Sequence, residues 1–441
     1  MAKYKAYPEY KDSGVEWLGE IPLNWNYTPH KYLAVYYKGR TPTTLSSEPK
    51  RDCVPYLSMS YLRTNIVEHY TLVTSDARVV PDDLVLIIWD GSNAGEFIKS
   101  KSGILSSTMA VANITPKLSH QYYWFSCNCI EPEIRRHATG MGIPHVNGEH
   151  LRYIAIPSPS VDEQIKISQF LIHETMKIDL LVEKQQQLIE LLKEKRQAVI
   201  SHAVTKGLNP DLPMKNCGIE WCGSTPAHWS SLKLKYIFSI QKNIAGKTGF
   251  EILSITQRGI VIKDTQSGEG QLSMDYSKYQ RVEPGKFAMN HMDLLTGYVD
   301  ISKYDGVTSP DYRVFYLKNN IAFHDKYYLY LLQNGYKQRL FFHLGQGSSH
   351  LGRWRLPTEA FNEINYPVPP YIEQKRITSH INNETTKIDT LIQKQLQQIE
   401  LLKERRTALI SAAVTGKIDL RDWTPPASST ETSLTAEEAT A

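Results

Sequence analysis

Two long stretches of the chain carry apolar residues at the three- and four-residue spacing of an amphipathic helix. The first opens at Ser160-Val-Asp-Glu163, which has the spacing of a capping box, and contains no Gly or Pro until Gly207. The second follows Pro369-Pro370 and ends at Gly416, where glycine can adopt the left-handed conformation of a helix C-cap. We therefore predict two helices of about 44 residues each, the first either unbroken or broken near His173.

The apolar stripe on each predicted helix needs a partner surface, and the nearest one is the other helix. Because a domain of about 150 residues separates the two helices, an antiparallel coiled coil is the expected pairing. Gln185 and Gln395 would lie in the seam and fix its register. Two separate helices, each docked on its own domain, are the alternative. The expected pairing residues are Ile178, Leu181, Leu188, Leu192 and Val199, with Ile388, Leu391, Ile399, Leu402 and Leu409.

The chain is an internal repeat, and the repeat decides the domain organisation. Gly14-Val-Glu-Trp17-Leu-Gly19 recurs as Gly218-Ile-Glu-Trp221-Cys-Gly223, and the six residues Ile189 to Glu194 recur unchanged as Ile399 to Glu404. The segments between these copies differ strongly. We therefore expect two domains with one fold and different surfaces, which suits a molecule that performs one kind of recognition on two unlike targets.

Both intervening segments show short apolar runs, such as 84–89, 109–114 and 312–317, that are separated by Gly, Ser, Asn and Asp turns. The sequence thus predicts a mixed α/β (α+β) fold, with two pseudo-symmetric domains separated by two long helices that form an antiparallel coiled coil. The expected segments are an N-terminal segment (1–19), a first domain (20–156), a central helical region with a linker (157–223), a second domain (224–366), a C-terminal helical region (367–423) and a disordered tail (424–441).

Composition narrows the class of protein. With 441 residues, 41% hydrophobic and 22% charged, the chain reads as a soluble globular protein of two or three domains. No apolar run is long enough to span a membrane and no signal peptide is recognisable, so we expect a cytoplasmic protein. The net charge of +4 permits nucleic-acid binding without requiring it. Five scattered cysteines indicate no disulfide framework, and the pairs Cys127/Cys129 and Cys217/Cys222 lack the usual spacing of metal ligands, so we expect no metal site.

Enzyme motifs are incomplete in this sequence. Gly246-Lys-Thr248 lacks the first glycine of a phosphate-binding loop, because position 241 is Gln. Gly140-Met-Gly142 and Gly345-Gln-Gly347 lack the third glycine of a dinucleotide-binding fingerprint. We therefore expect no catalytic residue and no cofactor in this chain.

The loops of both domains are rich in basic and amide side chains. Arg can donate two hydrogen bonds to guanine and Asn or Gln can pair with adenine, whereas Lys and Ser hold phosphates. For any single residue, an ordinary solvated loop side chain is the alternative. The candidate DNA-binding residues of the first domain are Lys38, Arg40, Thr41, Ser92, Asn93, Arg135, Arg136, Met141, His145 and Asn147. Those of the second domain are Lys242, Asn243, Gln257, Arg258, Asn290, Gln346, Ser348, Ser349, His350, Arg353 and Arg355.

Over nearly its whole length the chain resembles the specificity subunit of a type I restriction-modification system. The resemblance rests on Trp17-Leu-Gly19-x-x-Pro22-x-x-Trp25 with its copy at 221–229, and on Pro157-x-Pro159-x-x-x-Glu163-Gln164 with its copy at 367–374. The loop from Gly140 to Asn147, ahead of the first helix, adds to it. In the second domain the corresponding loop reads Gly-Gln-Gly-Ser-Ser instead of Gly-Met-Gly-Ile-Pro, so different DNA half-sites are expected.

The resemblance implies that two target-recognition domains each read one half of a bipartite, asymmetric double-stranded DNA target. It implies that the two helices set the spacer and dock two modification (methyltransferase) subunits. Methylation and ATP-driven cleavage would belong to these and to restriction (translocase/nuclease) subunits, which would bind S-adenosylmethionine, ATP and Mg²⁺. Two other hypotheses are a nuclease or methyltransferase that acts alone, and a scaffold subunit that binds proteins without reading DNA.

Overall fold

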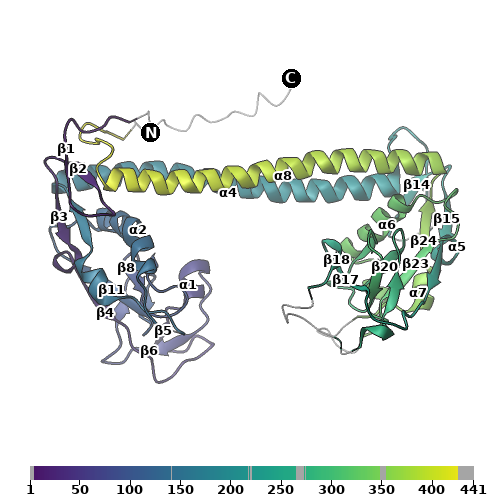
Figure 1. Ribbon diagram of the computed structural model, residues 1–441, viewed down its shortest axis with the longest axis horizontal. Helices are drawn as coiled ribbons and strands as arrows, with labels where there is room; N and C mark the ends of the chain where they lie inside the picture. Colours follow the sequence, from purple (N-terminus) through teal and green to yellow (C-terminus); the bar gives the residue numbers. More distant parts are fainter. Residues whose placement is uncertain are drawn as a thin grey trace. The chain divides into compact units, whose positions relative to one another are not determined.

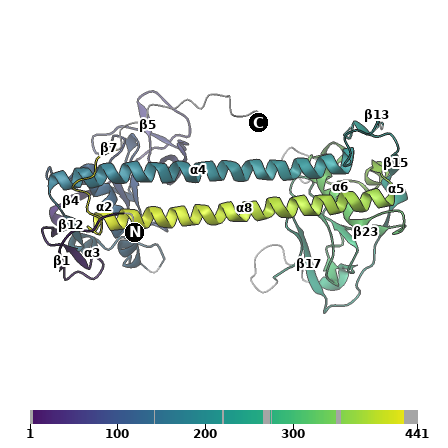
Figure 2. The ribbon, with the colours of Figure 1, turned by 90° about the horizontal axis from the view of Figure 1, so that it is seen from above.

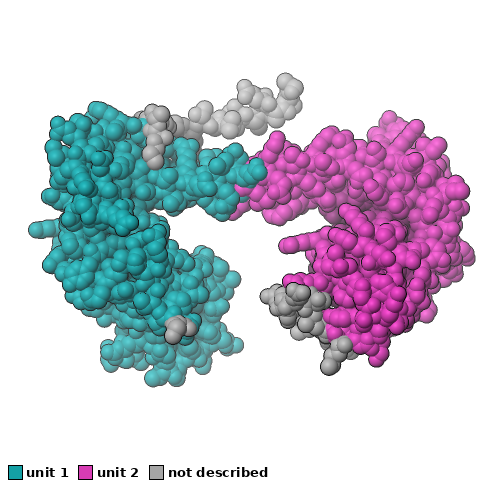
Figure 3. Space-filling model, in the orientation of Figure 1, with its two compact units in different colours: residues 1–185, 397–441 teal, residues 186–396 magenta. Residues whose placement is uncertain are grey.

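The computed structural model describes residues 4–425, except 141, 217, 219–220, 265–272, 274 and 348–353. The chain forms two compact units (Figure 3): unit 1 comprises residues 1–185 and 397–441, and unit 2 comprises residues 186–396. Each unit therefore combines one of the predicted domains with parts of both long helices. The predicted disordered tail, beyond residue 425, lies outside the described residues.

The two long helices are α4 (Val161–Lys206) and α8 (Tyr371–Val414), drawn in teal and yellow-green in Figure 2. At the start of α4 the backbone N–H of Glu163 donates to Ser160 Oγ over 3.3 Å, and the N–H of Ser160 donates to Glu163 Oε2 over 3.3 Å. This is the reciprocal bonding of a capping box. Gly207 and Gly416, just beyond the helices, have φ values of 76° and 73°. Of the two possibilities for the first helix, the unbroken one is correct, because α4 is continuous at His173.

Within unit 1 the short strands surround one antiparallel four-stranded sheet of order β4-β11-β8-β9, and four further strand pairs flank it (Figure 1). The sheet strands are β4 (Ala34–Lys38), β8 (Val85–Ile88), β9 (Phe97–Lys99) and β11 (Met109–Ile114). The other strands are β1 (Tyr10–Asp12) with β2 (Glu20–Pro22), β3 (Asn26–Pro29) with β12 (Ala155–Ser158), β5 (Cys53–Pro55) with β6 (Tyr70–Leu72), and β7 (Val79–Val80) with β10 (Gly103–Ile104). The helices are η1 (His30–Tyr32), α1 (Met59–Thr64), α2 (His120–Arg136) and α3 (Gly148–Tyr153).

Unit 2 repeats this plan with a sheet of order β16-β23-β20-β21, and adds a second four-stranded sheet of order β18-β17-β22-β19. The first sheet consists of β16 (Phe238–Gln241), β20 (Phe287–Met289), β21 (Val299–Ile301) and β23 (Arg313–Leu317). The second consists of β17 (Glu251–Thr256), β18 (Gly259–Ile262), β19 (Gln280–Val282) and β22 (Gly306–Thr308). The remaining elements are β13 (Met214–Asn216), β14 (Ser224–Pro226), β15 (Ser230–Lys233), β24 (Asn365–Val368), α5 (Leu234–Ile237), η2 (Tyr276–Lys278), α6 (Asp325–Lys337), η3 (Phe342–Leu344) and α7 (Thr358–Glu363).

The same anchoring contact occurs in both units. Gln164 Oε1 accepts a hydrogen bond from the backbone of Ser119, at the start of α2, over 2.9 Å. Gln374 Oε1 accepts the equivalent bond from His324, at the start of α6, over 2.8 Å. The first turn of each long helix thereby fixes the helix that packs on the sheet. The predicted mixed fold with two pseudo-symmetric domains is confirmed.

Each unit contains an antiparallel pairing of the two long helices. In unit 1 the first half of α4 packs against the last turns of α8, and Asp179 accepts from Arg406 Nε over 2.9 Å. In unit 2 the last half of α4 packs against the first turns of α8, and Asp389 accepts from Arg196 Nε over 2.9 Å. Apolar residues from both helices join the core of each unit, so the pairing is continuous with the core of the domain that it supports.

The predicted register of the helix pair was partly wrong. Ile178, Ile388, Ile399 and Leu409 are buried, and Leu192, Val199 and Leu402 are half-buried. Leu181, Leu188 and Leu391 are instead 47%, 40% and 44% exposed. The more buried positions in α4 are Ile178, Val182, Gln185 and Ile189, so Leu181 and Leu188 lie one residue, about 100° of helix rotation, away from the seam.

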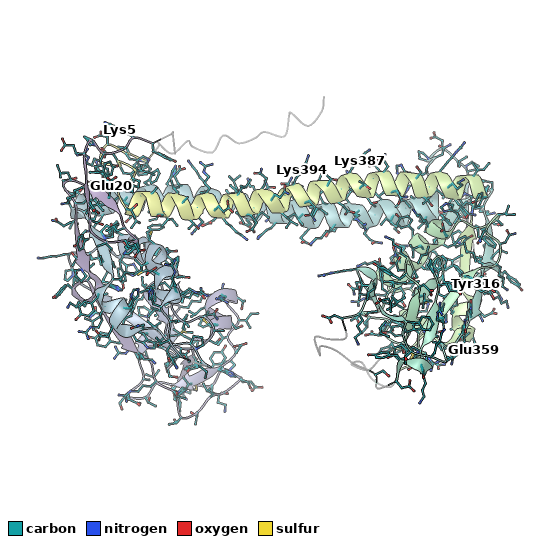
Figure 4. All side chains as sticks on the ribbon, viewed as in Figure 1. Lys5, Glu20, Tyr316, Glu359, Lys387 and Lys394 are labelled. Atoms are coloured by element: carbon teal, nitrogen blue, oxygen red, sulfur yellow. The ribbon has the colours of Figure 1, made fainter. Side chains whose placement is uncertain are left out.

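The long helices expose charged side chains and several leucines. Figure 4 shows Lys387 and Lys394 projecting outward from α8, and both side chains are exposed. Among the described helices, none combines the length and the apolar character that a membrane span requires.

Candidate nucleic-acid interface

In unit 1, three segments meet at one edge of the sheet around the carboxylate of Asp90. Lys38 Nζ, at the end of β4, donates to Asp90 Oδ2 over 2.7 Å. His145 Nδ1 donates to Asp90 Oδ1 over 2.7 Å. Partial burial raises the pKa of Asp90, but the hydrogen bonds from Lys38 and His145 outweigh it and lower that pKa below its usual value. The charged carboxylate therefore holds two candidate DNA-binding side chains in fixed positions.

The turn that carries Asp90 follows from the sequence of β8 and the glycines after it. All four residues of β8 are buried, so the chain must turn where the apolar run ends. Gly91 and Gly95 have φ values of 107° and 91°, which residues other than glycine rarely adopt. Ser92 is exposed at the tip of this turn, and Asn93 is half-buried.

The second part of this edge is the loop between α2 and α3. Thr139 and His145 form an antiparallel bridge, in which the N–H of Thr139 donates to the carbonyl oxygen of His145 over 2.9 Å. Gly140 has a φ of 117°, and a side chain there would collide with the carbonyl of Ile143. Asn147 caps α3, because its side chain accepts from the N–H of His150 over 3.1 Å. Met141, another candidate, lies outside the described residues.

The remaining candidates of unit 1 already have partners. Arg40 pairs with Asp76 over 3.3 Å, and Arg136 pairs with Glu133 over 2.8 Å. Arg135 pairs with Glu131 over 3.2 Å, and its side chain packs under Gly95. Thr41 Oγ1 donates to Ser107 Oγ over 3.0 Å. Arg135 thus supports the turn that contains Asp90. Arg40 and Arg136 would have to break their ion pairs with Asp76 and Glu133 before they could bind DNA.

A chain of buried hydrogen bonds connects β4, α2 and α3 beneath this edge. His30 Nδ1 donates to the carbonyl oxygen of Leu151 over 3.1 Å, and His30 Nε2 accepts from the Tyr123 hydroxyl over 2.8 Å. Tyr36 extends the chain with a 2.5 Å contact to the Tyr123 hydroxyl. Burial lowers the pKa of His30 to about 4, so the imidazole is neutral at pH 7. Above this chain lies a cavity of about 740 Å³, lined by Tyr36, Trp89 and Asn147 among others.

Unit 2 presents the corresponding loop at the corresponding edge. Gln346 and Arg355 form an antiparallel bridge like that of Thr139 and His145, with backbone hydrogen bonds of 2.8 and 3.0 Å. The side chain of Asn290, after β20, accepts from the N–H of Met292 over 3.3 Å. Ser348, Ser349, His350 and Arg353 lie outside the described residues.

Two buried residues beneath this loop were absent from the predicted site. Arg313, on β23, donates to the carbonyl oxygen of Leu356 over 3.0 Å and lies 4.6 Å from the centre of the Phe361 ring. His291 is buried beside it, and desolvation together with the charges of Arg313 and Arg355 lowers the pKa of His291 to about 3. The edge of unit 2 therefore contains two guanidinium groups, Arg313 and Arg355, whereas the edge of unit 1 contains the carboxylate of Asp90.

The basic candidates of unit 2 also differ in their pairing. Lys242 and Asn243 are exposed after β16, and Gln257 and Arg258 are exposed in the turn between β17 and β18. Within the described part of the chain, Lys242, Arg258 and Arg355 form no ion pair. Their charges are available to a polyanion without first breaking a contact.

Two cysteines of α2 have raised thiol pKa values. Burial raises the pKa of the Cys127 thiol, and it raises that of Cys129 to about 12. Both thiols are therefore protonated at neutral pH. Cys217 lies outside the described residues.

Comparison with known proteins agrees with this geometry. A family model described as the type I restriction modification DNA specificity domain matches residues 22–191 and 228–401. The MjaVIII specificity subunit of a type I restriction enzyme from Methanocaldococcus jannaschii is 27% identical over 423 residues, which cover 91% of this chain and 95% of that protein.

Two solved structures align with most of this chain. One, from a study of complex assembly and conformational transition of the type I R-M system, has a TM-score of 0.59 at 14% identity and covers 90% of this chain and 99% of its own. The HsdS subunit from Thermoanaerobacter tengcongensis has a TM-score of 0.48 at 14% identity, covering 90% and 98%. Since the family model matches well over half of the residues, once in each repeat, the chain belongs to the type I restriction modification DNA specificity family and contains two target-recognition domains.

Proposed function

We propose that this chain reads the DNA target of a type I restriction-modification complex, with one half-site for each unit. The observation that carries this proposal is the repeated sheet edge. Both units place the same bridged loop at the same edge of a sheet of the same strand order, yet the side chains at that edge differ. One scaffold with two chemically different edges is what recognition of an asymmetric, bipartite sequence requires.

The two edges would read DNA by different means. In unit 1, Lys38 and His145 are oriented by Asp90, and Asn93 and Ser92 lie on the adjoining turn. In unit 2, Arg355 and Arg258 have the donor geometry that suits guanine in the major groove, and Lys242 suits a phosphate. The candidates of unit 2 would therefore contribute mainly to affinity, through their positive charge. Those of unit 1 would contribute mainly to specificity, through hydrogen-bonding groups in a fixed arrangement.

We infer that the two long helices set the separation of the half-sites. They comprise 46 and 44 residues without interruption, which corresponds to on the order of 65 Å of helix. Their pairing in each unit is reinforced by ion pairs and by a shared core. A continuous paired helix resists bending, so it suits the role of a spacer of fixed length.

The exposed leucines of the helices are the proposed docking surface for two modification subunits. Leu180 and Leu191 of α4 are 51% and 61% exposed, and Leu401 of α8 is 56% exposed. Leu181, Leu188 and Leu391, which we had assigned to the helix seam, belong to the same exposed set. Exposed leucines in each unit, on helices that otherwise expose charged side chains, support a role of these helices in binding other proteins.

We place the chemistry in the partner subunits. Methylation with S-adenosylmethionine would belong to the two modification subunits, and ATP- and Mg²⁺-dependent translocation and cleavage to restriction subunits. The chain itself would be non-catalytic and would bind no membrane. Because its target is DNA and its partners use ATP, we expect the complex in the cytoplasm.

Selection of binding sites from a random DNA library tests this function. The chain, assembled with its modification subunit, should enrich two short motifs at one fixed separation, whereas the modification subunit alone should not. Exchanging residues 345–347 and 354–356 for the equivalent residues of the first loop should change one motif and leave the other intact. Enrichment without any motif by a correctly assembled complex would refute DNA reading by this chain.

A further inference from the structure

A cluster of three metal-ligating side chains lies in unit 1, away from the Asp90 edge. Glu133 and His137 are four residues apart at the end of α2, so they share one face of the helix. His150, in α3, stacks on His137 with the ring centres 4.1 Å apart. Glu133 Oε1 lies 3.3 Å from His137 Nδ1 and 3.9 Å from His150 Nε2. One ligand atom from each residue lies within 4.8 Å of the other two.

One nitrogen atom of the cluster has no hydrogen-bond partner. His150 Nε2 is buried and has no hydrogen-bond partner, since its distance to the Glu133 carboxylate is too long for one. A buried polar atom without a partner is costly, and it points to a missing ligand.

The carboxylate of Glu133 has one oxygen on each side of the cluster. Oε2 pairs with Arg136 Nη1 over 2.8 Å, and Oε1 lies 3.3 Å from His137 Nδ1, which also donates to the carbonyl oxygen of Glu133 over 3.0 Å. The C-terminal end of α2, where its carbonyl groups carry partial negative charge, adds to the potential of the carboxylate. Glu133 and His150 also line a cavity of about 670 Å³, which gives an ion and its water a route from solvent.

We propose that Glu133, His137 and His150 bind one Zn²⁺ ion, with water as the fourth ligand. Two imidazoles and one carboxylate are a common zinc ligand set, and tetrahedral ligands at 2.0 to 2.2 Å lie about 3.4 Å apart. The present spacing of 3.3 to 4.8 Å reaches that value through small side-chain rotations. Among the described residues, no other group of three His, Cys, Asp or Glu side chains converges in this way.

The ion would connect the end of α2 to α3. These two helices flank the loop at 138–147, which contains Thr139 and His145. Bound Zn²⁺ fixes the residue before the loop, His137, and a residue just after it, His150. The bound ion therefore restricts the two ends of the loop, and Zn²⁺ should protect this segment from proteolysis.

The second half of the chain provides a control without the site. When the Tyr122-Tyr123 pair of α2 is aligned with Tyr327-Tyr328 of α6, Glu133 and His137 match Gln338 and Phe342, which follow the end of α6 at Lys337. Leu151 of α3 corresponds to Phe361 of α7, so His150 corresponds to Ala360. None of the three equivalents is a metal ligand. The substitutions Glu133→Gln, His137→Phe and His150→Ala therefore introduce the residues that the second copy has at these sequence positions.

Titration of the metal-free, full-length chain with Zn²⁺ tests the proposal. We expect one ion per chain with a Kd below about 10 μM, and a higher Tm with Zn²⁺ than with chelator. The triple variant E133Q/H137F/H150A should lose more than about 100-fold in affinity. The variant H202A, which removes an exposed histidine of α4, should bind as the wild type does. Substitution of Co²⁺ should give the visible absorption of a tetrahedral ion only when the three ligands are present.

The result has two readings. Stoichiometric binding that disappears in the triple variant and persists in H202A supports the site. Absence of binding by the wild type, or equal binding by the wild type and the triple variant, overturns it. If the triple variant fails to match the Tm of the metal-free wild type, the single variant H150A takes its place, and an unchanged Co²⁺ spectrum in H150A also overturns the proposal.

Discussion

Asp90 and His145 lie 55 positions apart in the chain, yet their Oδ1 and Nδ1 atoms are 2.7 Å apart. The other oxygen of Asp90 accepts from Lys38. The carboxylate therefore joins the ends of two strands to the loop ahead of α3. This contact converts three separate loop segments into one surface of defined geometry.

Replacing Asp90 with Asn should separate affinity from specificity. The substitution removes a negative charge from a surface that meets phosphates, so non-specific DNA binding should strengthen. It also removes the ionic clamp on Lys38 and His145, so discrimination at the first half-site should fall by about 1 to 3 kcal/mol. Competition binding with matched and mismatched DNA measures both effects. Glu190→Gln, which removes one charge from the exposed face of α4, is the control, and equal effects of the two variants would contradict the assignment.

Arg355 tests base reading in unit 2. Truncation to Ala should cost about 1 to 3 kcal/mol at one base pair of the second half-site, with the other positions unaffected. Arg136→Ala should have a smaller effect, because that guanidinium is already paired with Glu133. Binding to a set of single-substitution DNA sites distinguishes the two variants. A uniform loss across all sites for Arg355→Ala would assign it to a phosphate instead.

The two copies of the capping glutamate should differ in their contribution to stability. Glu163 is buried and accepts from Trp25 Nε1 over 3.1 Å and from the Tyr7 hydroxyl over 3.2 Å. Glu163→Ala leaves both donors unpaired, so it should lower the free energy of unfolding by about 2 to 4 kcal/mol. Glu373 instead pairs with the half-exposed His228, and Glu373→Ala should cost less than about 1 kcal/mol. Denaturant unfolding measures both variants, and equal losses would contradict this account.

Acid should destabilise unit 1 through His30. Its pKa is about 4 in the folded chain against about 6.5 when unfolded, so only the unfolded state binds a proton between these values. Stability from this group is complete above pH 6.5, and on the order of 3 kcal/mol is lost as the pH falls to 4. His30→Gln should flatten the dependence of unfolding free energy on pH in this window, whatever its effect at pH 7. His202→Gln, at an exposed position, should keep the wild-type slope, and an unchanged slope in His30→Gln would show that another group dominates.

The length of the helices should determine the DNA spacer. Residues 186–189 of α4 and 396–399 of α8 are equivalent positions of the repeat. Deleting both segments shortens each helix by about 6 Å, which corresponds to one or two base pairs. Site selection with the shortened chain should return the same half-sites at a smaller separation. The same half-sites at the original separation would rule out a role of the helices as a ruler.

Local signals explain why the helices were predictable. The capping box at Ser160 and the glycines at 207 and 416 act within a few residues, so the ends of the helices could be located from sequence. The seam could not, because Leu181 and Val182 are both apolar and only the partner helix decides which of them is buried. The repeat itself revealed the two domains of one fold.

The site was less accessible to sequence reasoning because it depends on strand register. Lys38 and His145 were recognised as candidates, but Asp90, which positions both, was not. Asn147 was expected to meet DNA, and the structure assigns it a capping role for α3. The cluster of Glu133, His137 and His150 gives only one local signal, the four-residue spacing on α2, and its third member comes from another helix.

Methylation mapping of a host genome tests the central claim most directly. The host would express the cognate modification subunit with or without this chain. We predict one bipartite motif, methylated at adenine in both halves, that appears only when the chain is present. An active modification subunit that forms a complex with the chain and leaves no such motif would contradict the proposed function.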